Sequence, residues 1–563
     1  MMSRFSATVL LFNHGKLGRL MIRISVFCFC CLFTVLPSST TAQTGHENHG
    51  GGPVPRSILE MPVGLRQGIG KLHEKVSTTS PDAQAFYDQG LAYLHSFVWI
   101  EAIRSFHQAL RLDPKMGMAF LRLSEAYIGL QDVQTARSAF QRAADLTASL
   151  TDRERTWIDI YGSEIALAES NGDLDKYAEY RKSINRALKS YPSDPWFWIQ
   201  RGLADEGTVF SHGQAGGADT LAFYRTALSL APNNLAARHY YAHTLENLGK
   251  TKEALEETEN YLREAPAIPH AHHMRGHELT RLGRTEEAIA EFLKTKSLED
   301  EYYRIEKIPA RYDWHHAHNL QLLAMCYESL GQIKAAETAF RESYATPGYT
   351  EFLEFNRKDW PEFLLARGRY QEALEVSQEL SQSPWVFARL AGHTLSGMAL
   401  LATHKVEDAV EQLHLAEQDT EQLPLSVVAT SQFPTTLRAA LLLRNKQTEE
   451  GDSILRDLSQ AILARPGPDA WSASRFELDA LAATARQNGE WDLSELIANE
   501  IIAHDPAYGG GYFAVGLAEE HRGASEKAKK AYREAQARWA KADAELLELK
   551  HIQEFLGRVS RPN

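Results

Sequence analysis

The sequence has very little cysteine. Of the four cysteines in 563 residues, three lie together at positions 28, 30 and 31, in an apolar stretch near the N-terminus. The fourth, Cys326, lies in an apolar helical stretch (322–327), which predicts a small buried side chain rather than a reactive thiol. One remaining thiol cannot form a disulfide framework or a redox pair within the chain.

An excess of basic residues is also absent. The chain has 60 Lys and Arg against 73 Asp and Glu, so its net charge is -13. The first 42 residues contain four basic residues and no acidic one, so the rest of the chain carries a net charge of -17. Such an acidic chain lacks the electrostatic footprint of nucleic-acid binding, and no nucleic-acid partner is expected.

No long hydrophobic run is present either, and the longest one indicates export. The apolar run 24–36 is too short to span a bilayer comfortably. It follows Arg23 and precedes small residues that end at Ala42, which is the pattern of a secretory signal peptide. We therefore expect residues 1–42 to be removed, Met21 to be a second candidate start, and the mature protein to be periplasmic or secreted without a stable transmembrane anchor.

Residues 43–64 are predicted to be a flexible segment that contains His and Gly. The stretch Gly45–Gly52 contains His46 and His49. Short histidine-rich tracts can bind metal, but a solvated tail is the simpler interpretation of this stretch.

A repeating pattern of small and large residues follows. Its first unit has small or aromatic residues, and then a proline, at Gly90, Ala102, Phe106, Ala109 and Pro114. This is the pattern of a 34-residue tetratricopeptide repeat. Small residues let two antiparallel helices approach, large ones fill the space between them, and proline ends the second helix.

The period recurs along almost the whole chain. Turn glycines mark later units at Gly249, Gly283, Gly331, Gly368, Gly489 and Gly523. The sequence therefore predicts an all-α, right-handed superhelical solenoid of about ten to twelve helical pairs with a concave surface. We expect the main array at 65–440, and further helical repeats with a long capping helix (Ala531–Leu556) at 441–563.

Three stretches depart from the period. They are the glycine-rich insertion His212–Gly217, the segment Asp300–His316, and the irregular stretch Gln418–Thr436. Inserted loops in solenoids tend to gather on one face, which is often the binding face.

Histidines are concentrated in the central repeats, within residues 235–320. When each turn glycine is counted as position 15, positions 2, 5 and 9 of the first helix share the face that lines the concave groove. Six histidines from three consecutive first helices occupy these positions: His239 and His243, then His270, His273 and His277, then His318. His272 falls on the inward face as a structural histidine, and His95 is expected to lie too far along the solenoid to join the set.

This arrangement predicts a transition-metal site. The spacing HxxxH places two imidazoles on one side of a helix, and it occurs at His239/His243 and at His273/His277. Imidazole nitrogens suit zinc, copper or iron, and carboxylates complete such sites. The candidate supporting carboxylates are Glu246, Asp313 and Glu206.

The same residues resemble a family of exported bacterial tetratricopeptide repeat proteins. The similar stretches are Thr78–Leu91, Asp152–Ile158, His270–Gly283 and His315–Leu320. The resemblance extends from about residue 65 to the region of Asp543, and it implies the solenoid fold but no settled activity.

Three functions stay open from the sequence. The first is an extracytoplasmic binding or scaffold protein that binds a peptide or protein partner in its groove and holds a metal through the histidines. The second is a metalloenzyme that uses the same histidines with an open coordination position. The third is a metal-free scaffold that binds peptides. No nucleophilic triad or phosphate-binding glycine loop is evident, so enzymatic activity is not the leading interpretation.

Overall fold

The computed structural model describes residues 54–170, 173–206, 212–348, 350–423, 433–465 and 467–559. The predicted signal peptide, its cleavage site at Ala42, and His46 and His49 lie outside these ranges. Within them, every regular element is a helix, and none is long and apolar enough to cross a membrane.

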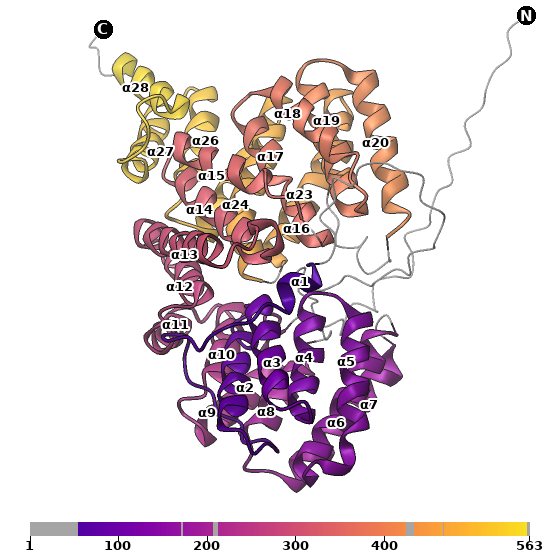
Figure 1. The fold of residues 1–563 in the computed structure, drawn as a ribbon. Helices are drawn as coiled ribbons and strands as arrows, with labels where there is room; N and C mark the ends of the chain where they lie inside the picture. The colour runs from indigo at the N-terminus through magenta and orange to yellow at the C-terminus, as the bar shows by residue number, and fades with distance from the viewer. Residues whose placement is uncertain are drawn as a thin grey trace, which may run out of the picture.

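Consecutive helices form antiparallel pairs that stack along the chain (Figure 1). In the N-terminal half these pairs are α2 (Pro81–Leu94) with α3 (Trp99–Leu112), α4 (Gly117–Gly129) with α5 (Val133–Asp145), α6 (Asp152–Ala168) with α7 (Leu174–Ser190), α8 (Pro195–Leu203) with α9 (Ala218–Leu230), and α10 (Leu235–Asn247) with α11 (Thr251–Glu264). In the rest they are α12 (Pro269–Arg281) with α13 (Thr285–Glu306), α14 (Trp314–Ser329) with α15 (Ile333–Tyr344), α17 (Asp359–Ala366) with α18 (Tyr370–Leu380), α19 (Val386–Ala402) with α20 (Val406–Thr420), α22 (Phe433–Arg444) with α23 (Thr448–Ala464), α24 (Pro468–Gln487) with α25 (Trp491–His504), and α26 (Gly509–His521) with α27 (Ser525–Arg538).

The stack agrees with the predicted number of pairs and forms a right-handed superhelical solenoid. Short helices add to it at α1 (Arg56–Leu59), α16 (Glu351–Asn356) and α28 (Leu547–Val559). The expected boundary between the main array (65–440) and the C-terminal repeats (441–563) falls inside helix α22, so the stack continues across it. Buried apolar residues follow the stack, with one cluster from Val54 to Tyr312 and further clusters beyond it.

The turn glycines have the conformation that the repeat requires. Gly249, Gly283 and Gly331 have φ values of 69°, 70° and 72°, in the left-handed region that favours glycine. These glycines therefore lie in the turns between paired helices, as assumed when each was counted as position 15 of its repeat.

Small residues permit the close approach of each helical pair. A Cβ atom on Gly90 would lie 2.4 Å from the ring of Phe106, and one on Gly276 would lie 2.6 Å from the ring of Phe292. Glycine on the first helix and an aromatic ring on the second thus fill one space together.

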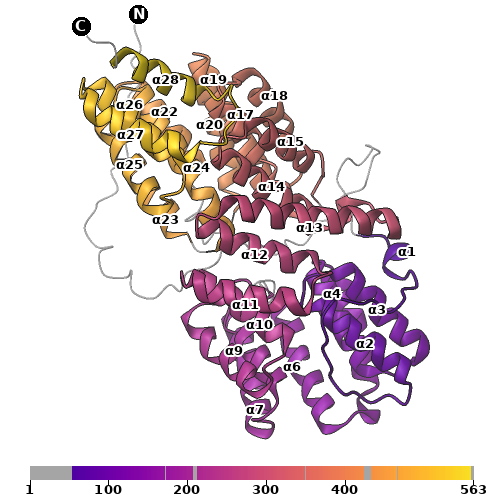
Figure 2. The ribbon, with the colours of Figure 1, turned by 90° about the vertical axis from the view of Figure 1, so that its left-hand side faces the viewer.

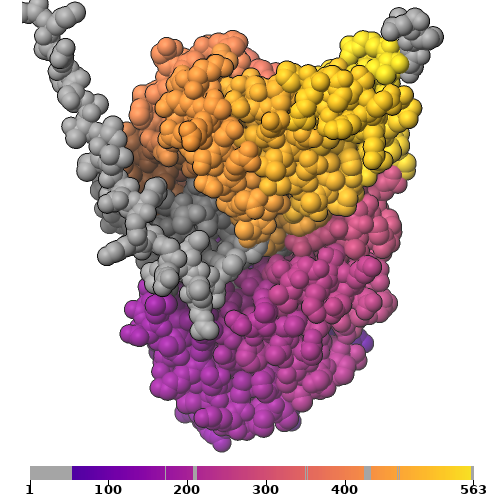
Figure 3. Space-filling view, turned by 180° about the vertical axis from the view of Figure 1, so that it is seen from behind, coloured from indigo at the N-terminus to yellow at the C-terminus, as the bar shows by residue number. Residues whose placement is uncertain are grey.

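The long helix α13 connects the centre of the solenoid to its first repeat. Tyr302 donates a hydrogen bond of 2.8 Å to Glu101, and Glu306 pairs with Arg104 at 2.8 Å. The segment Asp300–His316, which departs from the repeat period, therefore connects the central repeats to the first repeat through the C-terminal end of α13. Figure 2 shows α12 and α13 crossing between the two halves of the molecule, and Figure 3 shows these halves from behind.

The C-terminal repeats also return to the centre. Helix α24 contacts α10, α12 and α14, and the backbone carbonyl of Gly467, just before α24, accepts a hydrogen bond from Arg281 on α12. The first helices of the central repeats are therefore covered from both ends of the chain.

One expectation from the sequence is corrected here. The long capping helix Ala531–Leu556 is two helices, α27 and α28, because the chain turns after Arg538 so that Trp539 can bond the carbonyl of Ser329 and Asp543 that of Gly331. Within the segment 43–64, which was expected to be flexible, the described residues 54–64 include helix α1, and Leu59 is buried against the first repeat.

Candidate metal centre

Three parallel first helices bring seven histidines together in the interior. Helix α10 supplies two, α12 three and α14 two: His239, His243, His270, His273, His277, His315 and His318. Their nitrogens form three groups that could each hold a metal ion: His239/His243/His270, His270/His273/His315, and His273/His277/His318. The six histidines expected from the sequence are all included, and His315 is an addition.

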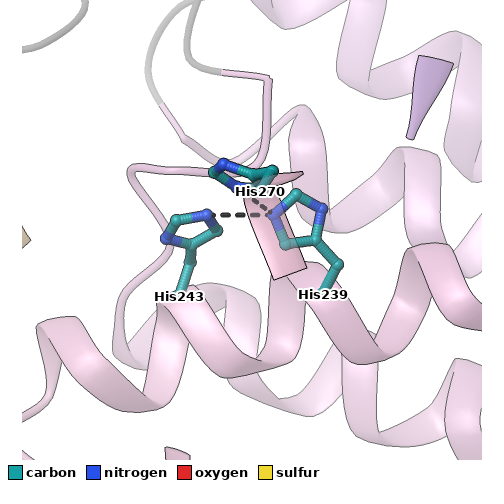
Figure 4. Close-up of side chains that lie close together, drawn as sticks. All are labelled: His239, His243 and His270. Atoms are coloured by element: carbon teal, nitrogen blue, oxygen red, sulfur yellow. Dashed lines mark hydrogen bonds between the residues drawn. The ribbon is translucent and has the colours of Figure 1, made fainter. Parts of the chain in front are cut away.

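The first group has the nitrogen spacing of a metal site. The Nε2 atom of His239 lies 3.1 Å from that of His243 and 2.9 Å from that of His270, and the three rings point toward one another (Figure 4). In a tetrahedral zinc site with bonds of about 2.0–2.1 Å, ligand nitrogens lie roughly 3.3 Å apart. Two of the three distances in the group are therefore close to this value, and all three nitrogens lie within 4.8 Å of one another.

The other ring nitrogen of His239 is fixed by the first repeat. Its Nδ1 atom donates a hydrogen bond of 2.7 Å to the backbone carbonyl of His95, which places the proton on Nδ1 and leaves Nε2 unprotonated. This orientation by an outer hydrogen bond is typical of metal-bound histidines. The imidazole of His95 does not join the metal-binding groups, as expected, and bonds Tyr240 instead. The expected distance was wrong, because the superhelix brings the α2–α3 turn back to α10 and the carbonyl of His95 reaches His239.

The third group is oriented in the same way. His273 Nδ1 donates to the side-chain oxygen of Asn319 at 3.1 Å, and the amide of Asn319 is itself fixed by a 3.0 Å bond to the carbonyl of Phe292. His273 Nε2 is thereby left unprotonated, 2.8 Å from Nε2 of His277. His318 closes the group at a ring-centroid distance of 4.9 Å from His273.

A carboxylate holds the histidine that the sequence analysis missed. His315 Nδ1 donates to Glu299 at 2.6 Å, and His316 Nδ1 donates to the other oxygen at 2.8 Å. Burial would raise the pKa of Glu299, but these two hydrogen bonds outweigh it and the pKa is lowered. The Nε2 atom of His315 then lies 3.1 Å from Nδ1 of His270.

Acidic side chains border the groups. Glu246 is fully buried and lies 3.4 Å from Nδ1 of His277 and 3.9 Å from Nδ1 of His243. Arg281 approaches the same carboxylate at 3.3 Å. Asp469, at the start of α24, lies 3.5 Å from Nε2 of His318.

The other two proposed carboxylates are engaged elsewhere. Asp313 accepts the backbone N–H of His315 at 3.0 Å as the cap of α14, and the hydroxyl of Tyr303 at 2.8 Å. Glu206 accepts the N–H of Gly213 at 2.9 Å and the hydroxyl of Tyr224 at 2.7 Å. It therefore anchors the glycine-rich insertion and does not join the histidines.

The cluster is enclosed and does not line an open groove. All seven histidines are at most 6% exposed. Phe97 covers His239 and His270 at ring-centroid distances of 4.6 and 4.9 Å, and Trp314 stacks on His318 at 5.8 Å. The expected groove face is buried because both ends of the chain return to it.

Burial favours the neutral form of five imidazoles, those of His239, His243, His270, His273 and His318. It lowers the pKa of His239 to about 3 and that of His318 to about 4. It also lowers the pKa of His243, His270 and His273 well below the usual value, and neighbouring imidazoles add to this effect. Neutral imidazole is the form that coordinates a metal.

His272, expected to be a structural histidine, does not belong to the metal-binding groups. His272 bonds Glu291 at 2.6 Å and the carbonyl of Pro266 at 3.2 Å, so its hydrogen bonds are satisfied outside the cluster. Cys326 is buried, as expected.

Three family models described as tetratricopeptide repeat match this chain. The matched residues are 99–150, 223–256, 269–301 and 317–345. The last three ranges contain the central repeats with α10, α12 and most of α14, which supply the histidines. No curated protein matches the chain.

Solved structures also show similarity at low identity. They include MamA from Desulfovibrio magneticus (18% identity, 35% of this chain and 96% of that one, TM-score 0.28). Yeast Tom70 is 12% identical over 85% of this chain and 90% of its own, with a TM-score of 0.29. Human IFIT1 is 13% identical over 82% and 92%, with a TM-score of 0.37.

Proposed function

Because the chain is built from tetratricopeptide repeats, we propose that it is an extracytoplasmic binding and scaffold protein whose buried histidines hold a transition metal. The observation that carries the metal is the orientation of His239. Its Nδ1–H donates a hydrogen bond to a backbone carbonyl. Its unprotonated Nε2 lies 3.1 and 2.9 Å from the Nε2 atoms of two further imidazoles. An all-imidazole ligand set suits zinc, copper or iron.

The metal has a structural role in this proposal. The ligands come from three successive repeats, and the cover comes from the first repeat and from α24. An ion at this junction would fix the curvature of the whole solenoid. Exclusion of solvent by Phe97 and Trp314 supports a closed site over an enzymatic one.

The metalloenzyme alternative has one observation in its favour. Each histidine group supplies three imidazoles, and catalytic zinc sites use three protein ligands with a fourth position open. A catalytic ion should exchange its fourth ligand with azide or cyanide and change its absorption spectrum when cobalt is bound. A closed structural site should not respond.

The partner site lies elsewhere in the solenoid. Since the histidines are enclosed, we assign the peptide or protein partner to a cavity of about 540 Å³ in the C-terminal half. Helices α14, α17, α19 and α24 line it, with apolar Phe363, Met398 and Phe476 beside charged Glu328 and Arg486. Volumes of this size and mixed lining are typical of ligand sites. Met398→Trp, which fills the cavity, should abolish binding of peptides selected on the wild-type chain.

Elemental analysis tests the metal directly. The protein purified from its native compartment should contain zinc, copper or iron, and the variant His243→Ala/His277→Ala should contain none. His404→Ala, at a turn far from the cluster, serves as the control and should keep its metal. A wild-type protein without any transition metal would leave the metal-free scaffold as the better interpretation.

Export is tested separately. N-terminal sequencing of the mature protein should begin near Gln43, after the signal peptide. A soluble cytoplasmic pool that starts at Met1 or Met21 would contradict the extracytoplasmic location.

A further inference from the structure

We propose that the histidine cluster holds two transition-metal ions at once, each on three imidazoles. The first set is His239, His243 and His270, and the second is His273, His277 and His318. This inference rests on the proposed function, since it specifies how many ions the same cluster takes. It follows from counting the protons that the hydrogen bonds of the cluster require.

The first set, counted together with the neighbouring His315, lacks one proton. Nε2 of His239 is bare because its Nδ1 donates to the carbonyl of His95, and Nε2 of His315 is bare because its Nδ1 donates to Glu299. His270 lies between them, with Nε2 at 2.9 Å from the first and Nδ1 at 3.1 Å from the second. A neutral imidazole has one proton, so one of these contacts brings two lone pairs together.

The second set lacks a proton independently. Nε2 of His273 is bare because its Nδ1 donates to Asn319. Nδ1 of His277 lies 3.4 Å from the Glu246 carboxylate, which accepts no hydrogen bond from it. The negative charge of this carboxylate favours a proton on Nδ1, which leaves Nε2 of His277 bare as well. These two bare nitrogens are 2.8 Å apart.

A cation in each set resolves both contacts. An ion on Nε2 of His239, His243 and His270 leaves the proton of His270 on Nδ1, where it can donate to His315. An ion on the second set occupies the facing lone pairs of His273 and His277. An ion on the middle group, His270/His273/His315, would take a ligand from each set and leave His239 and His277 without a cation. Two outer ions therefore fit the hydrogen bonds better than one central ion.

The neighbouring charge is of the required sign. Glu246, Glu278 and Glu299 are at most 1% exposed, and neither oxygen of Glu246 or of Glu278 accepts a hydrogen bond. Arg281 is the guanidinium that approaches Glu246. The carboxylates of Glu246 and Glu299, which face His277 and His315, would offset part of the charge of two divalent ions.

The ligand chemistry selects the ions. Both sets are made of imidazoles, and among the described residues that form these groups there is no thiolate. Such sites suit Cu(II) and Zn(II), and Cu(II) binds most tightly among divalent first-row ions. Soft Cu(I), which favours sulfur ligands, is not expected.

Metal stoichiometry tests the inference. The full chain is stripped with a chelator, dialysed against Cu(II) or Zn(II) near neutral pH, and analysed for bound metal per chain. The wild type should retain two ions, and His243→Ala and His277→Ala should each retain one. Their combination should retain none. His272→Ala, on the same helix α12 but bonded to Glu291, is the matched control and should retain two.

Two results separate this inference from the proposed function. A wild type that retains one ion, lost completely in either single variant, would overturn the two-ion centre and leave the metal-binding function intact. A wild type that retains none would overturn both. If the variants do not fold, the wild type alone still decides. Its metal content should be two ions per chain, with about three imidazoles on each by X-ray absorption, and a content of one ion per chain would contradict the proposal.

Discussion

The Nε2 atoms of His239 and His270 lie 2.9 Å apart although 31 residues separate them in the chain. They belong to the first helices of consecutive repeats, α10 and α12, which lie next to each other in the stack. A repeat architecture thus converts a spacing along the sequence into a row of side chains across the fold. The histidine cluster exists because three consecutive repeats carry imidazoles on the same face.

The outer hydrogen bond to His273 should control metal affinity. Asn319→Ala removes the acceptor that fixes the ring of His273, so the affinity of the second set should fall about 10- to 100-fold. Competition with a chelator of known affinity measures this. Asn247→Ala is the matched control, because the Asn247 amide bonds the loop carbonyls of Gln214 and Gly216 instead of a histidine. An equal effect of both substitutions would argue against a role in orienting a ligand.

Much of the cluster could be predicted from the sequence because its geometry is local. The HxxxH spacing and the turn glycines determine which face of the helix His243 and His277 occupy, and no information on distant repeats is needed. The same local reasoning gave the pairing of helices, since each pair is closed by residues within one 34-residue unit.

The rest of the site depends on long-range closure. His95 and Phe97 reach the cluster only because the superhelix brings the first repeat against α10, a consequence of small rotations accumulated over several repeats. His315 was missed because α14 begins at Trp314, one turn earlier than the repeat period predicts, with Asp313 as its cap. A cap residue just before two histidines is the signal that could have found it.

Phe97 should control access to the cluster. This residue has φ 60°, a strained conformation for a bulky side chain, and its ring covers His239 and His270. Phe97→Ala should lower the free energy of unfolding by about 3–5 kcal/mol and speed the removal of metal by a chelator. Stopped-flow chelation measures the rate, without denaturant and at a temperature well below the unfolding transition. An unchanged rate despite the lower stability would show that ions enter by another path.

Acid should destabilise the metal-free protein through its buried histidines. Burial lowers the pKa of His95 to about 3 and that of His212 to about 4, as it does for His239 and His318. Between the unfolded value of about 6.5 and these folded values, the unfolded chain binds protons that the native chain does not. Stability is therefore lost as pH falls from about 6.5 toward 3, and bound metal is released over the acid range.

Urea unfolding at a series of pH values measures this effect. A free energy of unfolding that stays constant between pH 6.5 and 4 would contradict the neutral, buried state of these histidines. The loaded protein should unfold at a higher urea concentration than the stripped one. Each bound ion should add about 2.7 kcal/mol to the free energy of unfolding when free metal exceeds its Kd a hundredfold.

Glu164 should destabilise the protein as pH rises. Burial, and then the charge of Glu125, raise its pKa to about 8. Between about 4.5 and 8 the unfolded chain has released a proton that the native chain still holds, so stability falls with rising pH. Glu164→Gln should remove this dependence and gain on the order of 3 kcal/mol at pH 8. At pH 5 the variant and the wild type should be similar, since the carboxyl is then neutral in the native state, and a gain of equal size at both pH values would contradict the assignment.

Gly276 should be irreplaceable for packing, because it lies between His273 and His277 on the side of α12 that faces α13. An added Cβ would lie 2.6 Å from the ring of Phe292, closer than atoms can approach, so Gly276→Ala must push α12 away from α13. Although alanine favours helix by up to about 1 kcal/mol, the overpacking should cost about 1–3 kcal/mol.

Gly557→Ala is the matched control, because no atom lies within 4 Å of the added Cβ in helix α28, and it should be neutral or stabilising. Urea unfolding should show a loss of stability for Gly276→Ala and none for Gly557→Ala. Gly276→Ala should also weaken metal binding, because it shifts the helix that supplies three of the histidines. If Gly276→Ala is as stable as Gly557→Ala, the close approach of α12 and α13 is not what fixes the positions of these imidazoles.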